Sequence, residues 1–192
     1  MSELSIQETH EQSLEVTRQV LHAFGWFGIS VDVLSDAEKR TLQNGIETSV
    51  LNWPWAMTQY AGNVSEGILD IALKVTDHTV ADGLHAVIIC KFDQRRDEFA
   101  ICMLENFIND QTTVLTGNVL TIALVYATTF CDINEIEDIG IQDPSDVAKP
   151  RYRSYGFAED FTRFNRMSST VIDVKLQILR KIREMESDSN DE

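Results

Sequence analysis

Histidine and cysteine, the side chains that most often carry catalysis or bind metals, are scattered along this chain. No two histidines have the HxxxH spacing of a zinc site, and no Ser, His and Asp grouping stands out. The cysteines are odd in number, lie in apolar surroundings and form no CxxC pair, so they indicate neither a disulfide framework nor a metal site. These residues are His10, His22, His78, His85, Cys90, Cys102 and Cys131. Metal catalysis and a hydrolase triad therefore have no support in the sequence.

The charge of the chain narrows the classes of partner. Sixteen Lys and Arg stand against thirty-one Asp and Glu, a formal net charge of −15, which repels nucleic acid and anionic membranes and favours amines or basic protein surfaces. An alternative interpretation is that the charge only maintains solubility. The start of the chain lacks a signal-like pattern, and no apolar run reaches the ~20 residues that span a bilayer. We expect a soluble, cytoplasmic protein that binds neither nucleic acid nor membrane.

Length and local signals predict how the chain is organised. At 192 residues, 43% of them hydrophobic, it can bury one substantial core, and we expect a single domain over 1–192. Residues 1–7 and 186–192 show little apolar pattern and are expected to be disordered tails. The clearest local signal is a capping box, in which Ser35 and Glu38 can each cap the other's backbone. It predicts a helix that starts directly after Ser35.

The remaining elements follow from the spacing of apolar residues. In order, we expect a helix over about 9–25, a strand at 29–33, a helix at 36–48, a short helix opening at Pro54, strands at 69–75, 84–93 and 98–108, a helix after Gly117, a strand at 136–141, a helix that starts near 143–145, is interrupted by Pro150 and ends at Gly156, and one or two strands within 163–178. Residues 68–75 also fit a helical spacing, but their alternation favours a strand. The three middle strands then form an antiparallel meander.

This order of elements resembles the GNAT superfamily of acyl-CoA-dependent N-acyltransferases, with an extra helix in front. At residue level, Ala148, Tyr152 and the Gly156-Phe157 pair look like the "N..A...Y...GF" ending of that family. The segment IDVKLQILRKI, from Ile172, is similar to the closing strand of many members. The resemblance covers about 30–182 in element order. It implies an α+β fold, in which a mixed, mostly antiparallel sheet of six to seven strands is flanked by helices.

The resemblance also implies a binding site for acetyl-CoA or another acyl-CoA. In that family the pantetheine pairs with a bulge in the fourth strand, and the pyrophosphate binds the amides of the loop before the next helix, whose N-terminus favours negative charge. The matching positions here are Leu104, Asn106, Gln111, Thr116, Gly117 and Asn118. This loop departs from the family pattern, because Leu115 stands in the place of the first glycine and the loop carries no Arg or Lys.

Acyl transfer to an amine requires a proton acceptor for the amine and a proton donor for the CoA sulfur. By the resemblance, Tyr152 would protonate the sulfur, and a carboxylate of the fourth strand, Glu98 or Glu105, would be the base. The alternatives are that Tyr152 packs its ring on the sheet and that the two glutamates are ordinary strand acids.

The resemblance thus predicts an N-acyltransferase that moves an acetyl or other acyl group from acyl-CoA to an amine of a small cationic molecule or of a basic protein, without a metal. The alternative is a non-catalytic, acidic interaction or inhibitor protein of the same fold that has lost CoA binding.

Overall fold

The computed structural model describes residues 5–190 of the chain. The helices are α1 (Ile6–Ala23), α2 (Asp36–Asn44), α3 (Trp53–Gln59), α4 (Val119–Ile133), α5 (Lys149–Arg153) and α6 (Val171–Asn190), with a short 3-10 helix η1 (Val64–Glu66). The strands are β1 (Ile29–Val33), β2 (Ile68–Asp77), β3 (Ala86–Asp93), β4 (Glu98–Asn106), β5 (Asp138–Gln142), β6 (Ala158–Glu159) and β7 (Arg166–Thr170). Together the strands form one sheet in the order β1-β2-β3-β4-β5-β7-β6.

All but one of the neighbouring strand pairs in this sheet are antiparallel, and the exception is β4 beside β5. The α+β fold, the number of strands and the antiparallel meander of β2, β3 and β4 are confirmed. The strand interpretation of β2 is also confirmed, because Ile71 and Leu73 are buried on one face of the sheet while Ala72, between them in the strand, belongs to the core of the other face.

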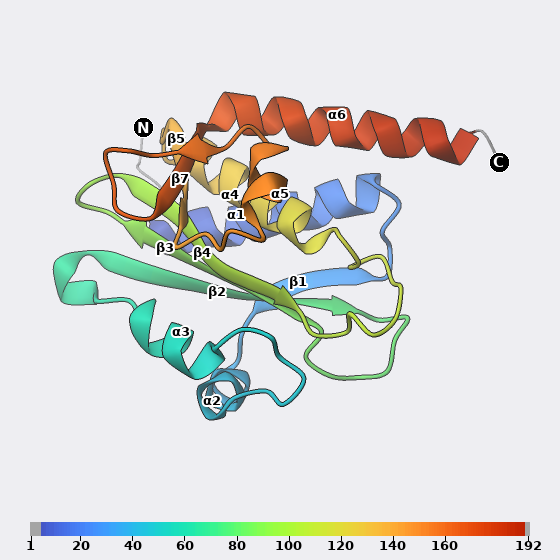
Figure 1. Cartoon of the computed structure of the whole chain (residues 1–192), viewed down its shortest axis with the longest axis horizontal. Coiled ribbons are helices and arrows are strands. Elements are labelled where there is room, and N and C mark those ends of the chain that lie inside the picture. Colours follow the sequence, from blue (N-terminus) through green and yellow to red (C-terminus); the bar gives the residue numbers. More distant parts are fainter. Residues whose placement is uncertain (1–4, 191–192) are drawn as a thin grey trace.

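Helices cover both faces of the sheet (Figure 1). The helices α1, α4 and α6 lie on one face, and α2 and α3 lie on the other. Helix α4 is the centre of the larger core, because 12 of its 15 side chains are buried against the sheet and against α1 and α6. Within the described residues, no helix is long and apolar enough to cross a membrane.

The two ends of the chain differ from the predicted tails. Helix α1 begins at Ile6, because Ser5 and Glu8 form a capping box that the sequence interpretation missed. Helix α6 continues to Asn190 and includes residues 186–190 of the expected acidic tail. The other predicted tail residues, 1–4 and 191–192, lie outside the described part of the chain.

The expectation that IDVKLQILRKI forms the closing strand is wrong, since these residues belong to α6 and the closing strand is the preceding β7. Val174, Ile178 and Ile182 recur every four residues and pack on the larger core, which requires a helix.

The predicted interruption at Pro150 is also wrong. This proline lies in the first turn of α5, where its missing N–H has no helical partner to lose. Helix α2 ends at Asn44, earlier than expected, because Gly45 leaves the helix with φ 92°.

Candidate active site

The centre of the candidate site is the point where β4 and β5 separate. Their parallel pairing covers only Phe99–Ile101 with Ile139–Ile141. Just beyond it, Cys102 is an extra residue in β4, because Ile101 and Met103 pair with consecutive residues of β3. A β-bulge bends its strand and interrupts the regular pairing. The bulge and the diverging strands therefore leave an opening at the middle of the sheet.

A cavity of about 410 Å³ lies at this opening, and we call it the strand-split cavity. It is lined by Leu51, Asn52, Trp55, Tyr60, Cys102, Met103, Leu104, Leu120, Asp143, Ser145, Ala148, Arg151 and Tyr152. The wall is mostly apolar with a few polar groups, which is typical of sites for organic ligands, and the volume lies within their usual range of about 300–1,000 Å³.

The N-terminal end of α4 lies beside this cavity, and an arginine from another element lies next to it. Arg151, on α5, donates a hydrogen bond from its guanidinium group to the carbonyl oxygen of Gly117. Gly117 has φ 76°, in the left-handed region that favours glycine. It directly precedes Asn118, the N-cap residue of α4. A positive side chain and the free N–H groups of a helix start therefore meet at one edge of the cavity.

Tyr152 is half-buried in the wall of the strand-split cavity, and its ring makes an edge contact with Phe157. Its hydroxyl has no hydrogen-bond partner among residues 5–190. Burial raises the pKa of Tyr152, so the hydroxyl keeps its proton near neutral pH and can act as a donor.

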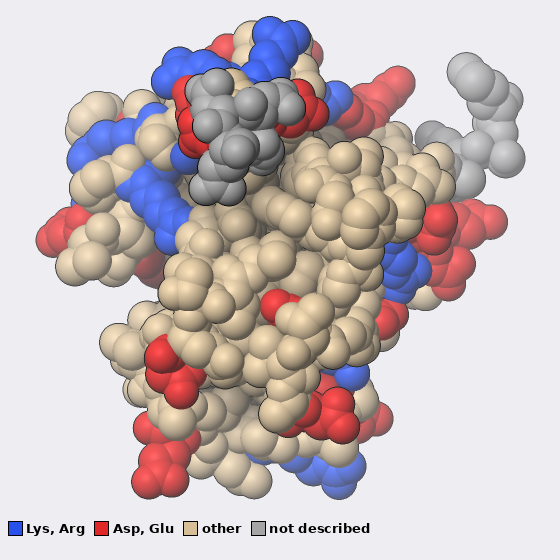
Figure 2. All heavy atoms as spheres, turned by 90° about the vertical axis from the view of Figure 1, so that its right-hand side faces the viewer, with Lys and Arg blue, Asp and Glu red and all other residues tan. Residues whose placement is uncertain are grey.

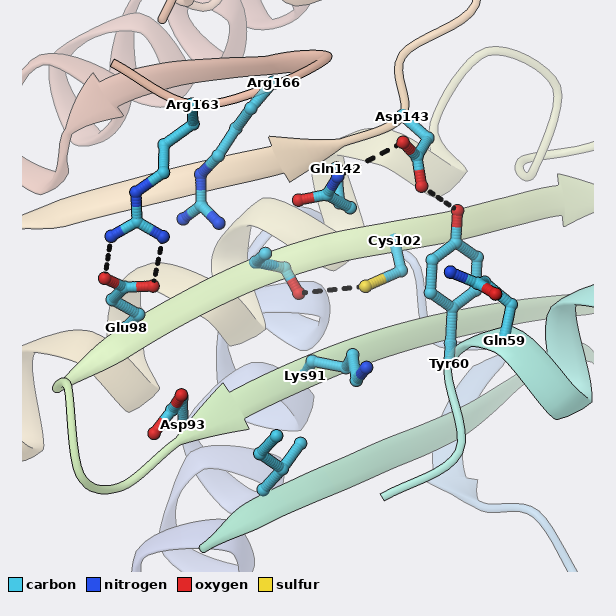
Figure 3. Close-up of a pocket in the computed structure, with 12 residues that line it drawn as sticks. Gln59, Tyr60, Lys91, Asp93, Glu98, Cys102, Gln142, Asp143, Arg163 and Arg166 are labelled. Atoms are coloured by element: carbon cyan, nitrogen blue, oxygen red, sulfur yellow. Dashed lines mark hydrogen bonds and ion pairs between the residues drawn. The ribbon is translucent and has the colours of Figure 1, made fainter. Parts of the chain in front are cut away.

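A second cavity, of about 240 Å³, lies on the α3 side of the sheet next to the first (Figure 3), and we call it the charged cavity. Its polar lining is formed by Gln59, Tyr60, Lys91, Asp93, Glu98, Cys102, Gln142, Asp143, Arg163 and Arg166. Tyr60, Cys102 and Asp143 line both cavities and so stand between them.

A hydrogen bond joins two of these shared residues. The hydroxyl of Tyr60 donates to Oδ2 of Asp143 at 2.8 Å. The other carboxylate oxygen of Asp143 accepts from Gln142 and Asn165, and Asp143 itself has φ 50°. A non-glycine residue in this conformation costs on the order of 1–3 kcal/mol and recurs at functional sites. Burial, followed by the bond to Asp143, raises the pKa of Tyr60.

The thiol of Cys102, at the bulge, is the third shared group. Burial raises its pKa to about 12, despite opposing effects of Lys91 and Arg166. The thiol is therefore protonated near neutral pH, which disfavours Cys102 as a nucleophile.

Known proteins were compared with the chain by sequence and by fold. No protein-family model matches it, and no curated protein matches its sequence. Solved structures do share its fold. AtaTR bound with acetyl-CoA is 14% identical with a TM-score of 0.52, over 78% of this chain and 97% of that one. A chimera of the spermidine N-acetyltransferase SpeG from Vibrio cholerae and hSSAT is 12% identical with a TM-score of 0.51, over 77% and 98%.

A third structure, the KacTA–DNA complex, is 10% identical with a TM-score of 0.52, over 83% of this chain and 99% of that one. At these identities the likeness concerns the fold, and the neighbours are acetyltransferases of GNAT fold. The chain has the GNAT fold. The element order and the short Tyr152 to Phe157 motif were therefore sound guides to its architecture.

Within this GNAT fold, the predicted catalytic residues do not come together. Tyr152 lines the strand-split cavity, Glu98 lines the charged cavity, and Glu105 lines neither. Glu98 forms an ion pair with Arg163, and the hydrogen bond from that arginine holds the pKa of Glu98 below its usual value. A carboxylate with a lowered pKa and a bound guanidinium is a poor proton acceptor.

Glu105 is engaged in a different task. Its carboxylate is buried and accepts hydrogen bonds from Ser49, from the N–H groups of Val50 and Leu51, and from the indole of Trp53. Distances are 2.8–3.1 Å. These four donors occupy the carboxylate, so the arrangement favours a structural role, in which Glu105 holds the segment before α3 on the sheet.

The predicted cofactor-binding residues are divided in a similar way. Leu104 lines the strand-split cavity, whereas the side chain of Asn106 accepts from the N–H of Ile108 and stabilises a turn. The bulge of β4 is at Cys102, which precedes both Leu104 and Asn106, the positions that the resemblance matched to it. The loop residues Gln111, Thr116, Gly117 and Asn118 all lie before α4, where the Asn118 amide donates to Val114 and the Thr116 hydroxyl accepts from the N–H of Thr113.

The sequence interpretation did not identify four residues of the site as neighbours in space. These are Tyr60, Cys102, Asp143 and Arg151. Arg151 supplies the positive charge that the loop before α4 lacks in sequence, although it is 34 residues away from Gly117. Tyr60 and Asp143 are 83 residues apart. No spacing rule links such positions, because only the packing of α3 and α5 against the split sheet brings them together.

One end of the molecule differs from the overall acidity of the chain. Figure 2 shows the end of the molecule that lies at the right of Figure 1. Its centre is largely uncharged, and Lys and Arg gather at the upper left. The net charge of −15 therefore does not describe every face.

In the described part of the chain, no cluster of His, Cys, Asp and Glu could hold a metal ion.

Proposed function

We propose that this chain is an N-acyltransferase that moves an acyl group, most simply acetyl, from acyl-CoA to an amine. The observation that carries the proposal is the strand-split cavity itself, which combines a β-bulge, the start of α4 with Arg151, and a free tyrosine hydroxyl. The structural likeness to a spermidine N-acetyltransferase and to a complex with bound acetyl-CoA supports the same reaction class.

The lining of the cavity suits acyl-CoA chemically. Met103, Leu104 and Leu120 provide an apolar wall, and Met103 and Leu104 lie on β4 beyond the end of its pairing with β5. Arg151 and the first N–H groups of α4 would hold the phosphates, as helix starts and guanidinium groups do in many proteins. When bound, acyl-CoA supplies an activated thioester, and every other requirement falls on side chains of this protein.

The geometry supports two roles in proton transfer. Tyr152, with its free hydroxyl and raised pKa, would donate a proton to the departing sulfur. Asp143 would accept the proton of the amine through the hydroxyl of Tyr60, which already donates to it. As the nitrogen–carbon bond forms and the carbon–sulfur bond breaks, one proton leaves the amine and one reaches the sulfur, so the protons balance.

The alternative function, an interaction protein without CoA binding, has one observation in its favour. Leu115, which takes the place of the first glycine of the family loop, is fully buried in the larger core. The packing of Leu115 in the core therefore shapes this half of the loop, and not the close approach of backbone amides to a phosphate. A protein partner would suit that function, and the neighbouring toxin AtaT is indeed described with its antitoxin AtaR.

Thermal unfolding with acetyl-CoA separates the two functions. At a concentration near 100 times Kd, binding should add about 2.7 kcal/mol to the free energy of unfolding. Arg151→Gln should reduce this gain, whereas the control Arg180→Gln, which removes an equal charge from the exposed side of α6, should keep it. If millimolar acetyl-CoA and longer acyl-CoAs leave the unfolding temperature unchanged, the acyltransferase function is refuted and the interaction protein is favoured.

A further inference from the structure

The charged cavity contains two cations without an anionic partner. Lys91, on β3, and Arg166, at the start of β7, both line it, and neither side chain forms a hydrogen bond or an ion pair with any described residue. Both are half-buried. Burial lowers the pKa of Arg166, which reflects the cost of holding an unpaired guanidinium group away from water.

The acids of the same cavity already have partners. Glu98 is paired with Arg163, and Asp143 accepts from Tyr60, Gln142 and Asn165. Asp93 accepts from two N–H groups of the turn that follows β3. Its Oδ2 lies 4.0 Å from Nε of Arg96. The three acids and three bases of the lining balance formally, and what distinguishes Lys91 and Arg166 is that their side chains have no direct hydrogen-bond or ion-pair partner among the described residues.

The backbone makes room for Arg166. Its guanidinium group lies directly on Gly140, in β5, so that a Cβ atom at this position would overlap Nη2, Cζ and Nε of the arginine. Figure 3 shows Arg166 reaching into the cavity from above, beside the paired Arg163, while Lys91 enters from the β3 side. Glycine at position 140 thus permits a specific placement of the unpaired cation.

We propose that Lys91 and Arg166 bind an anionic group of the acceptor, so that the substrate is a small amine that also carries a carboxylate or a phosphate. This inference rests on the proposed acyltransferase function. A planar guanidinium group and an ammonium group together suit either anion. With the anion held there, the amine end faces the shared wall of Tyr60, Cys102 and Asp143.

The size and charge of the cavity sharpen this substrate class. Its volume of about 240 Å³ is below the usual range of about 300–1,000 Å³ for drug-sized ligands, so the acceptor end that it holds is small. The net acidity of the chain favours a small cationic acceptor. A second positive charge placed next to Lys91 and Arg166 would be repelled by them, because the nearest charges act most strongly.

Matched amines test the inference through acetyl transfer. L-alanine is compared with L-alaninamide, O-phosphoethanolamine with ethanolamine, and spermidine represents the polyamines. The carboxylate or the phosphate member should exceed its neutral partner in kcat/KM by about tenfold or more, and the pair with the larger ratio identifies the anion. Equal values within both pairs, or a preference for spermidine, would overturn the anion site while acyl transfer itself stands.

Variants locate the effect. Arg166→Gln should remove the preference for the anionic amine, and Gly140→Ala should do the same although it keeps the charge, because the new methyl group displaces the guanidinium. Arg180→Gln should leave the preference unchanged. If both cavity variants keep the full preference, the anion does not bind at Arg166.

A binding measurement without acetyl-CoA keeps the two proposals distinguishable. N-acetyl-L-alanine and inorganic phosphate should raise the unfolding temperature of the wild-type protein, N-acetyl-L-alaninamide should not, and Arg166→Gln should abolish the rise. If this pattern holds while acetyl-CoA fails to bind, the anion site stands and the acyltransferase function falls. If neither N-acetyl-L-alanine nor phosphate stabilises the protein, the anion site is refuted.

Discussion

Replacing Glu105 by alanine should destabilise the protein strongly, because the carboxylate holds four donors at once. Hydrogen bonds to a charged group contribute about 1.5–3 kcal/mol each, but the contributions do not simply add. Val50 and Leu51 are exposed, so water can replace their partner, whereas the indole of Trp53 is buried and would be left unpaired. Losing charged hydrogen bonds and leaving the buried indole N–H unpaired together give an expected loss of about 3–5 kcal/mol in the free energy of unfolding.

The assay is urea unfolding, followed by circular dichroism and by tryptophan fluorescence, which reports on Trp53 together with Trp26 and Trp55. For a chain of this length the loss corresponds to a fall of roughly 6–20 °C in Tm. Glu98→Ala is the matched control. Its carboxylate forms a partly exposed ion pair with Arg163, for which we expect about 0–1 kcal/mol.

The comparison also decides between two roles for Glu105. A structural role predicts a large loss of stability, while a general base would lose turnover without losing stability. If Glu105→Ala and Glu98→Ala cost the same, the carboxylate does not hold the segment before α3, and the reasoning from its four donors is refuted.

Three further predictions concern single residues. Tyr152→Phe should lower kcat by about 10²–10⁴-fold without weakening acetyl-CoA binding; unchanged turnover would remove this hydroxyl from the mechanism. Ser35→Ala should cost about 0.5–2 kcal/mol in urea unfolding, because it removes the cap of α2; no loss would contradict the capping role. Because the pKa of Glu98 is lowered in the folded protein, its pair with Arg163 stabilises the protein fully above the ordinary Glu pKa of ~4.3. This stabilisation is lost as the pH falls through the lowered pKa of the folded protein. The stability difference between wild type and Arg163→Gln, measured by urea unfolding from pH 7 to 3, should therefore vanish on acidification, and a constant difference would contradict it.

Local patterns were sufficient for most of the fold. The capping box at Ser35, the alternation in β2 and the apolar face of α4 each depend on neighbouring residues, whose interactions a sequence displays directly. The interpretation failed at α6, where a β-branched, apolar stretch suited a strand as well as a helix. Contact with α4 decided in favour of the helix, and such contact has no local signature.

The sequence by itself determined the layers of this protein, its mixed sheet and the tyrosine beside the split between β4 and β5. Only the tertiary structure decided which charges matter. It carries Arg151 to the start of α4, occupies Glu105 with four donors, and leaves Lys91 and Arg166 unpaired in the charged cavity. The physical reason is that a charge acts through its nearest neighbours in space and through its burial, and the fold assigns both from residues far apart in the chain.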